Sequence, residues 1–203
     1  GKWIDVLNPS TEEVISRQPE GTIDDVDEAL DAARAAQKPW AALPAVERAK
    51  YLNRLADGIR KRSKEFVDII MREQGKTRTW ATVEVGVTAD YFDYMATFAR
   101  HIEGEVIPSD RPGETMILTK RPIGVVSGIL PWNFPFFLIA RKMAPALVTG
   151  NTIVIKPSEE TPNNAAKFAE LVAQTDLPPG VFNLVHGRGA TAGEALASDP
   201  HLG

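Results

Sequence analysis

The sequence contains no cysteine. A chain without cysteine has no disulfide framework, no thiolate ligand for a metal and no thiol nucleophile of its own. Long apolar runs are also missing, because Asn, Arg or Pro interrupts each one well before it could span a bilayer. Residues 1–5 carry no apolar segment of a secretory signal. We therefore expect a cytoplasmic protein that does not insert into a membrane.

Positive charge is not in excess either. Lys and Arg number 23 against 27 Asp and Glu, which gives a net charge of −4 and argues against a general nucleic-acid role. His101, His186 and His201 stand apart without metal-ligand spacing, so no metal site is expected. With 203 residues, 43% hydrophobic and 25% charged, the chain is typical of a globular protein of one large domain or two small ones.

Three helices are expected in the first half. Thr22 and Asp25 form an N-terminal capping signal, after which helical spacing continues up to Pro39. A second helix is predicted over 44–74, with Gly75 as its C-terminal cap. A third is predicted over about 79–102, with its apolar positions at Val83, Val87, Tyr91, Tyr94 and Phe98, and its aromatic residues are expected in the core.

Residues 104–122 change character. Two short β-prone runs, 105–107 and 115–119, flank the turn-forming segment 110–113. A hairpin or a pair of extended arms is the structure that this pattern predicts.

From residue 123 onward, strands alternate with helices. The predicted strands are 123–130, 152–156 and 181–185, and the predicted helices are about 136–148, 162–175 and 190–198. Three successive βα units indicate an α/β fold with a Rossmann-like parallel sheet. Ligands bind at the carboxyl ends of such strands. Here those ends carry the segments 131–133, 156–159 and 186–189.

Asn133 lies between two prolines at the first of these ends. Asn is a good turn residue, and an isolated turn residue rarely has a catalytic role, so Asn133 by itself favours a structural interpretation. The functional alternative is that its side-chain NH₂ donates to a developing oxyanion, which stabilises a transition state by a few kcal/mol. Trp132, Phe134 and Phe136 could then exclude water.

Lys156 and Glu159 lie at the carboxyl end of the second of these strands. A Lys that ends a strand can donate to ribose hydroxyls or phosphate, and a carboxylate can accept from a ribose diol. The alternative is a capped helix, with Ser158 or Thr161 as the cap and Lys156 paired with Glu159. The residues themselves do not decide between these interpretations.

The third end, HGRGATAG at 186–193, is one residue too long for the usual dinucleotide fingerprint. Its glycines could serve a turn that needs positive φ. A Gly-rich backbone at a helix start is also a place where a pyrophosphate could rest.

Taken in this order, the motifs resemble the NAD(P)-dependent aldehyde dehydrogenase superfamily. The resemblance rests on PWNFP at 131–135, GNTIVIKPSEETP at 150–162, LPPGVFNLVHGRGATAG at 177–193 and NPSTEEVI at 8–15, and it covers essentially the whole chain. Within the superfamily, ADYFDYMATFARHIEGE at 89–105 and ILPWNFPFFLIARKMAPAL at 129–147 are most similar to the bacterial lactaldehyde (glycolaldehyde) dehydrogenases.

The resemblance implies a role for particular residues. Asn133 matches the oxyanion-hole asparagine, and Lys156 and Glu159 match the pair that binds the adenosine ribose. The other positions implied beside the cofactor are Ile129, Leu130, Pro131, Trp132, Ser158, Gly189 and Gly193. The Glu159 carboxylate favours NAD over NADP, because a 2′-phosphate would meet a negative charge.

The resemblance also implies a division of the chain. Residues 1–103 match the N-terminal helical part of an NAD-binding domain, 104–122 match an oligomerisation arm, and 123–203 match the Rossmann-like part. A homo-oligomer, either a dimer or a tetramer, is therefore expected.

On a helix that starts near Pro135, the residues Phe134, Leu138 and Arg141 share a face that lines the substrate tunnel in the family. Many members carry a bulky apolar residue where this chain has Arg141. A guanidinium there suits an aldehyde that bears a hydroxyl or a carboxylate. The alternative is that Arg141 faces solvent or pairs with a distant acid.

The activity implied is NAD-dependent oxidation of a small polar aldehyde, of the lactaldehyde or glycolaldehyde type, to its acid. That reaction needs a cysteine thiolate and later a glutamate, so residues 1–203 alone are not expected to perform it. We expect the chain to be the N-terminal portion of a longer enzyme. The alternative is a complete, non-catalytic nucleotide-binding or interaction module that pairs through 104–122. An unrelated Rossmann reductase is disfavoured because no Tyr-x-x-x-Lys pair is present.

Overall fold

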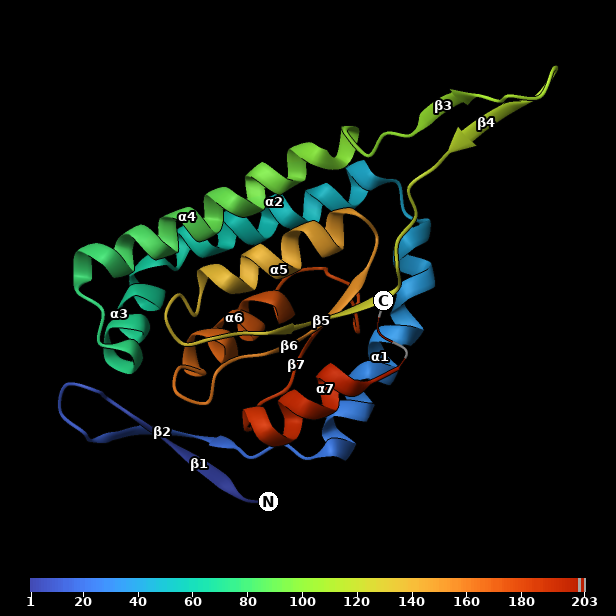
Figure 1. Ribbon diagram of the computed structural model, residues 1–203. Coiled ribbons are helices and arrows are strands. Elements are labelled where there is room, and N and C mark those ends of the chain that lie inside the picture. The colour runs from blue at the N-terminus through green and yellow to red at the C-terminus, as the bar shows by residue number, and fades with distance from the viewer. Residues whose placement is uncertain (201, 203) are drawn as a thin grey trace.

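The computed structural model describes residues 1–200 and 202, so His201 lies outside the described residues. Its centre is a parallel sheet with the strand order β5 (Val125–Ile129), β6 (Thr152–Lys156) and β7 (Phe182–Leu184), as Figure 1 shows. This confirms the predicted α/β class. The central strand β6 is buried at all five positions because helices cover both faces of the sheet.

The two faces of the sheet belong to two separate apolar clusters. Ile153 and Ile155 point to the larger cluster, and Val154 points to the smaller one. The helices on the larger side are α2 (Ala45–Lys61), α3 (Ser63–Gln74), α4 (Arg78–Thr97), α5 (Phe137–Val148) and α6 (Asn163–Ala173). Those on the smaller side are α1 (Ile23–Ala42) and α7 (Glu194–Ser198), the latter preceded by a π-helical turn, η2 (Gly189–Gly193).

Helix α1 begins as predicted and ends later than predicted. Thr22 and Asp25 form a complete capping box. The helix continues past Pro39 to Ala42. Trp40, which is 1% exposed, accounts for this last turn because its Nε1 donates to the carbonyl of Leu147 at 3.0 Å. Burial of the indole in the core outweighs the penalty of an internal proline.

The long second helix predicted over 44–74 is in fact two helices. The chain changes direction at Arg62, where φ is −105° and ψ is 17°. The bend allows Leu55 of α2 and Phe66 of α3 to enter the same core, both fully buried. Gly75 ends α3 in the left-handed conformation with φ of 75°, which confirms it as the C-cap.

Helix α4 buries a different face from the one predicted. The side chains of Val83, Val87 and Tyr94 are exposed, whereas a stripe of mostly small residues faces the core. The buried positions are Ala81, Glu84, Val85, Thr88, Ala89, Phe92 and Ala96. Small side chains allow the backbone of α4 to approach α2 closely, and this packing outweighs the larger residues on the other face. A short 3₁₀ turn, η1 (Phe98–Arg100), follows α4.

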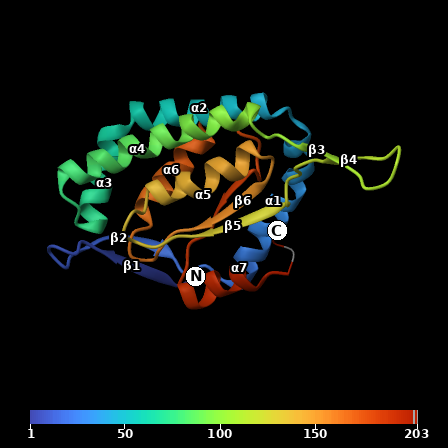
Figure 2. The same ribbon diagram turned by 45° about the horizontal axis from the view of Figure 1, so that its top comes forward.

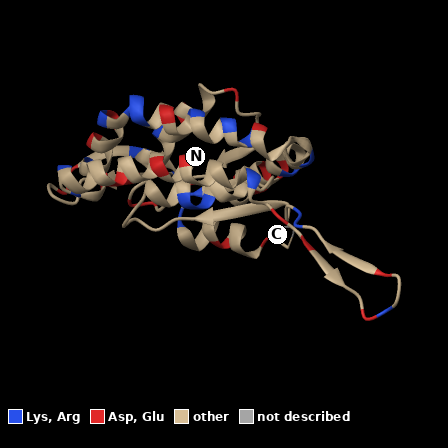
Figure 3. Cartoon of the chain, turned by 90° about the horizontal axis from the view of Figure 1, so that it is seen from above, with Lys and Arg blue, Asp and Glu red and all other residues tan. Residues whose placement is uncertain are grey.

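Two antiparallel hairpins complete the fold. The first joins β1 (Trp3–Leu7) to β2 (Val14–Pro19). The second joins β3 (Glu105–Pro108) to β4 (Thr115–Leu118), which confirms the predicted hairpin. It extends away from the helices, and all its strand residues are exposed (Figure 2). Its strands carry almost no charge, and the charged residues gather at its tip (Figure 3).

None of the helices in residues 1–200 is both long enough and apolar enough to cross a membrane.

Candidate functional site

The carboxyl ends of the three parallel strands meet at one edge of the sheet. Ile129 is in register with Lys156. Just beyond, the N–H of Leu130 donates to the carbonyl of Lys156 at 2.9 Å, and the N–H of Val185 donates to that of Ile155 at 2.9 Å. The segments that follow the strands therefore lie side by side, as the sequence predicts.

Asn133 lies in the exposed loop between β5 and α5. Its Oδ1 accepts a hydrogen bond from the N–H of Phe134 at 3.1 Å. Within the part of the chain that the structure describes, no acceptor is recorded for its Nδ2. The structural and functional interpretations of this residue are therefore compatible: the oxygen fixes the turn, and the NH₂ group is left to donate to a ligand.

The aromatic residues around Asn133 have two different environments. Trp132 and Phe134 are 56% and 41% exposed, so in this chain they do not close a dry pocket. Phe136 is fully buried and stacks on Phe66 with 4.4 Å between ring centroids. Phe136 therefore anchors the loop in the core, and the prediction that it excludes water beside Asn133 was wrong.

Two further residues contact this loop. The Lys76 Nζ donates to the carbonyl of Asn133 at 3.0 Å and pairs with Glu84 Oε2 at 2.5 Å. The Glu84 carboxylate also accepts from the N–H groups of Phe136 and Phe137. Neither residue was predicted from the sequence. A carboxylate among the small residues Ala81, Val85 and Thr88 would have been the signal, once the correct face of α4 was known.

The predicted ribose-binding pair is buried and satisfied within the protein. Lys156 is 1% exposed, and its Nζ donates to the carbonyls of Pro157 and Gly187 at 2.8 and 2.7 Å. Its third partner is Glu159 Oε2 at 3.3 Å. The other carboxylate oxygen of Glu159 accepts from the N–H of Gly189 at 3.3 Å. The pairing favoured by the structural interpretation is thus present.

Burial and the contacts between Lys156 and Glu159 change the pKa of both groups. Burial lowers the pKa of Lys156, and the neighbouring Glu159 only partly offsets this effect. Burial alone would raise the pKa of Glu159. Hydrogen bonds from its own N–H and from that of Gly189, together with the Lys156 charge, lower the pKa on balance. Glu159 is therefore a carboxylate at neutral pH, ready to accept hydrogen bonds.

The glycines of the third end approach the same cluster. A Cβ at Gly193 would lie 3.4 Å from the Cε of Lys156, whereas one at Gly189 would meet no atom within 4 Å. Gly187 adopts φ of 139°, and a Cβ there would lie 2.8 Å from that of Ala192. The turn-forming role is therefore seen at Gly187, while Gly189 leaves open space beside the Glu159 carboxylate.

The capping residues proposed from sequence for α6 were wrong. Ser158 accepts from the N–H of Glu160 at 3.2 Å and so stabilises the preceding turn. The first N–H groups of α6, those of Asn163 and Asn164, donate instead to Glu73 of α3 at 2.7 and 3.0 Å. The turn from Lys156 to Glu159 is also supported by Gln18 of β2, whose Nε2 donates to the carbonyl of Glu159 at 3.0 Å.

The remaining predicted residues are spread along the start of α5 and the end of β5. Leu138 is half-buried against the larger core, and its N–H donates to the carbonyl of Phe134 at 3.1 Å. Arg141 is exposed and lines a shallow pocket with Val126 and Ser127 of β5. No ion pair of Arg141 is recorded within residues 1–200 and 202. The predicted cofactor-side residues Ile129 and Pro131 are exposed, whereas Leu130 is buried.

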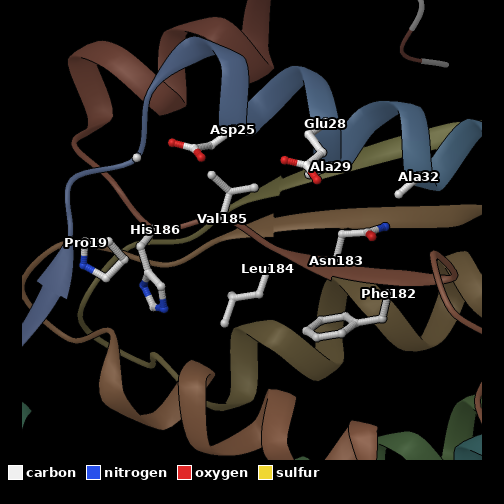
Figure 4. Close-up of a pocket in the computed structure, with 11 residues that line it drawn as sticks. Pro19, Asp25, Glu28, Ala29, Ala32, Phe182, Asn183, Leu184, Val185 and His186 are labelled. Atoms are coloured by element: carbon white, nitrogen blue, oxygen red, sulfur yellow. The ribbon is translucent and has the colours of Figure 1, made fainter. Parts of the chain in front are cut away.

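A separate pocket lies between α1 and the end of β7 (Figure 4). Its lining includes Asp25 and Glu28 of α1, Asn183 of β7, and His186. Burial and the nearby Lys156 charge lower the pKa of His186 to about 4, so the imidazole is neutral at pH 7. None of the residues predicted from sequence as catalytic, cofactor or substrate residues lines this pocket.

Comparison with known proteins gives a consistent picture. The sequence model of the aldehyde dehydrogenase family matches residues 1–203. Over 200 residues the chain is 62% identical to the lactaldehyde dehydrogenase of Escherichia coli (strain K12), covering 98% of this chain and 42% of the relative. A crystal structure of lactaldehyde dehydrogenase from Escherichia coli matches with a TM-score of 0.98 and 61% identity, covering 100% of this chain and 42% of that one.

Two further solved structures contain a nicotinamide cofactor. PnpE in complex with nicotinamide adenine dinucleotide matches with a TM-score of 0.96 and 42% identity. A 3,6-anhydro-L-galactose dehydrogenase in complex with NAP matches with a TM-score of 0.96 and 37% identity. In both cases the match covers 100% of this chain and 42% of the other. The chain thus spans less than half the length of these proteins.

Proposed function

Because the chain belongs to the aldehyde dehydrogenase family, we propose that the polypeptide carrying it oxidises a small polar aldehyde to its carboxylic acid with NAD. The observation that carries the proposal is the placement of Asn133. Its amide lies at the carboxyl end of β5, with Oδ1 held by the loop itself and Nδ2 left to donate. A donor fixed in this way stabilises negative charge that develops on an aldehyde oxygen.

The nucleophile of the proposed reaction lies elsewhere. The sequence contains no cysteine, and the thiolate is therefore assigned to a part of the polypeptide outside residues 1–203. When the thiolate attacks the carbonyl carbon, the former aldehyde oxygen becomes an oxyanion that accepts from Asn133 Nδ2. The contribution of this chain is to fix that donor and to hold the cofactor.

The residues at the second and third strand ends fit a dinucleotide. The Glu159 carboxylate, which accepts from the Gly189 N–H, would also accept from a ribose diol, and the open space beside Gly189 supports this role. The Lys156 Nζ already has three acceptors, so its contact with a ribose hydroxyl requires the exchange of one of them. NAD bound by these residues would supply the acceptor for the hydride that leaves the former aldehyde carbon. One solved relative is a complex with nicotinamide adenine dinucleotide, and the negative charge of Glu159 supports NAD over NADP here.

The preference for a small polar aldehyde rests on Arg141. It is an exposed cation on α5, eight positions after Asn133 and without a recorded carboxylate partner in the described chain. Phe134 in the preceding loop and Leu138 in the first turn of α5 supply apolar surface. A guanidinium at this position would bind a hydroxyl or carboxylate on the substrate. The 62% identity to a lactaldehyde dehydrogenase supports the same substrate class.

The β3–β4 hairpin supports the proposal of a homo-oligomer. Val106 and Ile117 are 73% and 71% exposed on facing positions of the two strands. An apolar hairpin that extends from the body is suited to a second copy of the chain. Aspartate at either position is then expected to lower the mass that light scattering measures for the full-length protein, and an unchanged mass would contradict this assignment.

One steady-state experiment on the full-length protein tests the function. We expect turnover of lactaldehyde and glycolaldehyde, with a higher kcat/KM for NAD than for NADP. Asn133→Ala is expected to lower kcat by about 100- to 1000-fold, because the oxyanion loses a donor. Asn53→Ala, a matched change at an exposed residue of α2, is expected to leave kcat unchanged.

The same assay examines the substrate class. Arg141→Leu is expected to lower kcat/KM for hydroxy-aldehydes relative to an alkyl aldehyde such as propanal. An unchanged ratio would remove Arg141 from the specificity assignment. A wild-type protein that oxidises none of these aldehydes, or an Asn133→Ala variant with full activity, would overturn the proposed function.

A further inference from the structure

Glu84 connects helix α4 to the start of helix α5. Its side chain is completely buried. One carboxylate oxygen accepts from the N–H groups of Phe136 and Phe137, at 2.9 and 3.2 Å. Phe136 is the N-cap of α5 and Phe137 is its first residue, and the N–H groups at the start of a helix have no acceptor within it. Glu84 therefore fixes the end of the loop that carries Asn133.

Lys76 connects the same loop to the corner between α3 and α4. It directly follows Gly75, the left-handed residue that ends α3. Its Nζ pairs with the second oxygen of Glu84 at 2.5 Å and donates to the Asn133 carbonyl at 3.0 Å. The same ammonium lies 4.0 Å from the ring centroid of Phe134, a distance at which a cation is attracted to an aromatic face.

Helix capping accounts for only part of this arrangement. A Ser or Thr at the N-cap would cap α5 through the N–H groups two or three positions on, without burying a charge. A buried ion pair is also poor evidence of a gain in stability, since apolar residues often replace such pairs without loss. The contacts of Lys76 with the Asn133 carbonyl and the Phe134 ring add nothing to the cap. They hold the carbonyl of Asn133 and the ring of Phe134, directly after the residue whose amide is to donate.

We propose that Lys76 and Glu84 are positioning residues that hold the 131–137 loop so that the Asn133 amide points at the aldehyde oxygen. This inference rests on the proposed function. Glu84 fixes the loop at the α5 end, and Lys76 fixes the Asn133 peptide and the Phe134 ring. Neither side chain needs to touch the substrate. Both act by limiting the orientations that Asn133 samples before the oxyanion forms.

The test uses the full-length protein and a double-mutant cycle. Lys76→Met preserves length and removes the charge and the donors. We expect kcat to fall by about 100-fold, as for a misplacement of about 1 Å, with little change in KM for NAD. In the Asn133→Ala background the same change is expected to have almost no further effect, because the residue that it positions is gone.

Lys64→Met is the matched control. Lys64 pairs with Asp68 at 2.7 Å, a similar distance, but on the exposed surface of α3 and away from the loop. We expect its kcat to equal that of the wild type. Hydrogen exchange supplies a second measurement, in which Lys76→Met accelerates exchange of the amides in 131–137 and Lys64→Met does not.

The possible results separate the two proposals. If Asn133→Ala is impaired and Lys76→Met is not, the positioning role is wrong and the proposed function stands. Multiplicative losses in the double variant, or faster exchange throughout the protein, would show that Lys76 supports only general stability and overturn the inference. A wild type without aldehyde oxidation would overturn the proposed function and the catalytic role of the loop together.

Discussion

Helices α1 and α5 obtain acceptors for their first N–H groups in different ways. In α1 the acceptor is the adjacent Thr22, whose Oγ1 accepts from the N–H of Asp25 at 3.3 Å, while Asp25 accepts in return from Thr22 at 2.7 Å. In α5 the acceptor is Glu84, 52 positions away from Phe136. The local arrangement stabilises one helix end. The distant one also fixes how two helices lie against each other.

Helix α6 shows a second form of the distant arrangement. Glu73 of α3 accepts from the N–H of Asn163, and from the N–H and Nδ2 of Asn164 at 3.0 and 2.6 Å. No lysine or arginine pairs with Glu73 among the described residues. Burial raises the pKa of Glu73 to about 7, although its hydrogen-bond donors oppose this rise. The buried carboxylate of Glu84 is thus compensated by the ammonium of Lys76 in an ion pair, whereas the carboxyl group of Glu73 can lose its charge by taking up a proton.

The largest effect is expected from removing the carboxylate of Glu84. Glu84→Ala leaves the Lys76 ammonium and two N–H groups without their partner, and should lower the free energy of unfolding by about 3–5 kcal/mol. Glu84→Gln keeps an acceptor for the N–H groups and should cost clearly less. Urea denaturation of the full-length protein measures both values. Equal losses for the two variants would show that the cap is unimportant, and a loss below about 1 kcal/mol for Ala would contradict the pairing itself.

A smaller change in the free energy of unfolding, which depends on pH, is expected from Glu73. Its pKa is about 7 in the folded protein and 4.5 ordinarily, so the folded state binds the extra proton between these values. The resulting stabilisation is complete below pH 4.5 and is lost as the pH rises through 7. It amounts to about 3 kcal/mol. Glu73→Gln cannot lose a proton, so its stability lacks this dependence on pH. The difference in the free energy of unfolding between the variant and the wild type should therefore shift by that amount in favour of the variant as the pH rises from 4.5 to 8.

Denaturation at several pH values measures this difference. His186 works in the opposite direction, because its lowered pKa gives a stabilisation that is present above pH 6.5 and lost as the pH falls towards 4. Subtracting the variant from the wild type at each pH removes the His186 contribution. A difference that does not change with pH would mean that the proton is not taken up at Glu73.

The same contrast explains which parts of the fold the sequence could predict. The Thr22–Asp25 box, the left-handed Gly75 and the β3–β4 turn depend on neighbouring residues, and all three predictions are confirmed. The parallel strands were found because continuous β-branched runs have few other uses. The bend at Arg62 and the buried face of α4 depend on packing against other helices. No local pattern contains that information. The predictions of one continuous helix over 44–74 and of the other buried face for α4 were therefore wrong.

The candidate site divides in the same way. Asn133, Lys156 and Glu159 could be proposed from the sequence because strand ends and turn residues mark them there. Lys76 and Glu84 were missed because their partners lie 57 and 52 positions away. Without the fold, a Lys and a Glu eight positions apart look like any solvated helix face. Only the structure places them behind the loop that carries Asn133.

The smallest effect is expected at the local cap. Thr22→Ala removes one acceptor that water can replace, and should lower the free energy of unfolding by about 1 kcal/mol. Thr82→Ala is the matched control, because Thr82 is exposed within α4 and its hydroxyl bonds only to the Arg78 carbonyl one turn earlier, at 2.8 Å. Alanine is the better helix former there, so we expect no loss.

Hydrogen exchange then separates the local cap from the distant one. Thr22→Ala should speed exchange in the first turn of α1 and leave the amides of 131–137 unchanged, since no contact recorded for Thr22 leads to the loop. Glu84→Gln should speed exchange in both α4 and the start of α5, because its carboxylate belongs to one helix and caps the other. If Thr22→Ala also loosened 131–137, helix capping would act on the site through general stability. The distinction between local and distant caps would then lose its functional meaning.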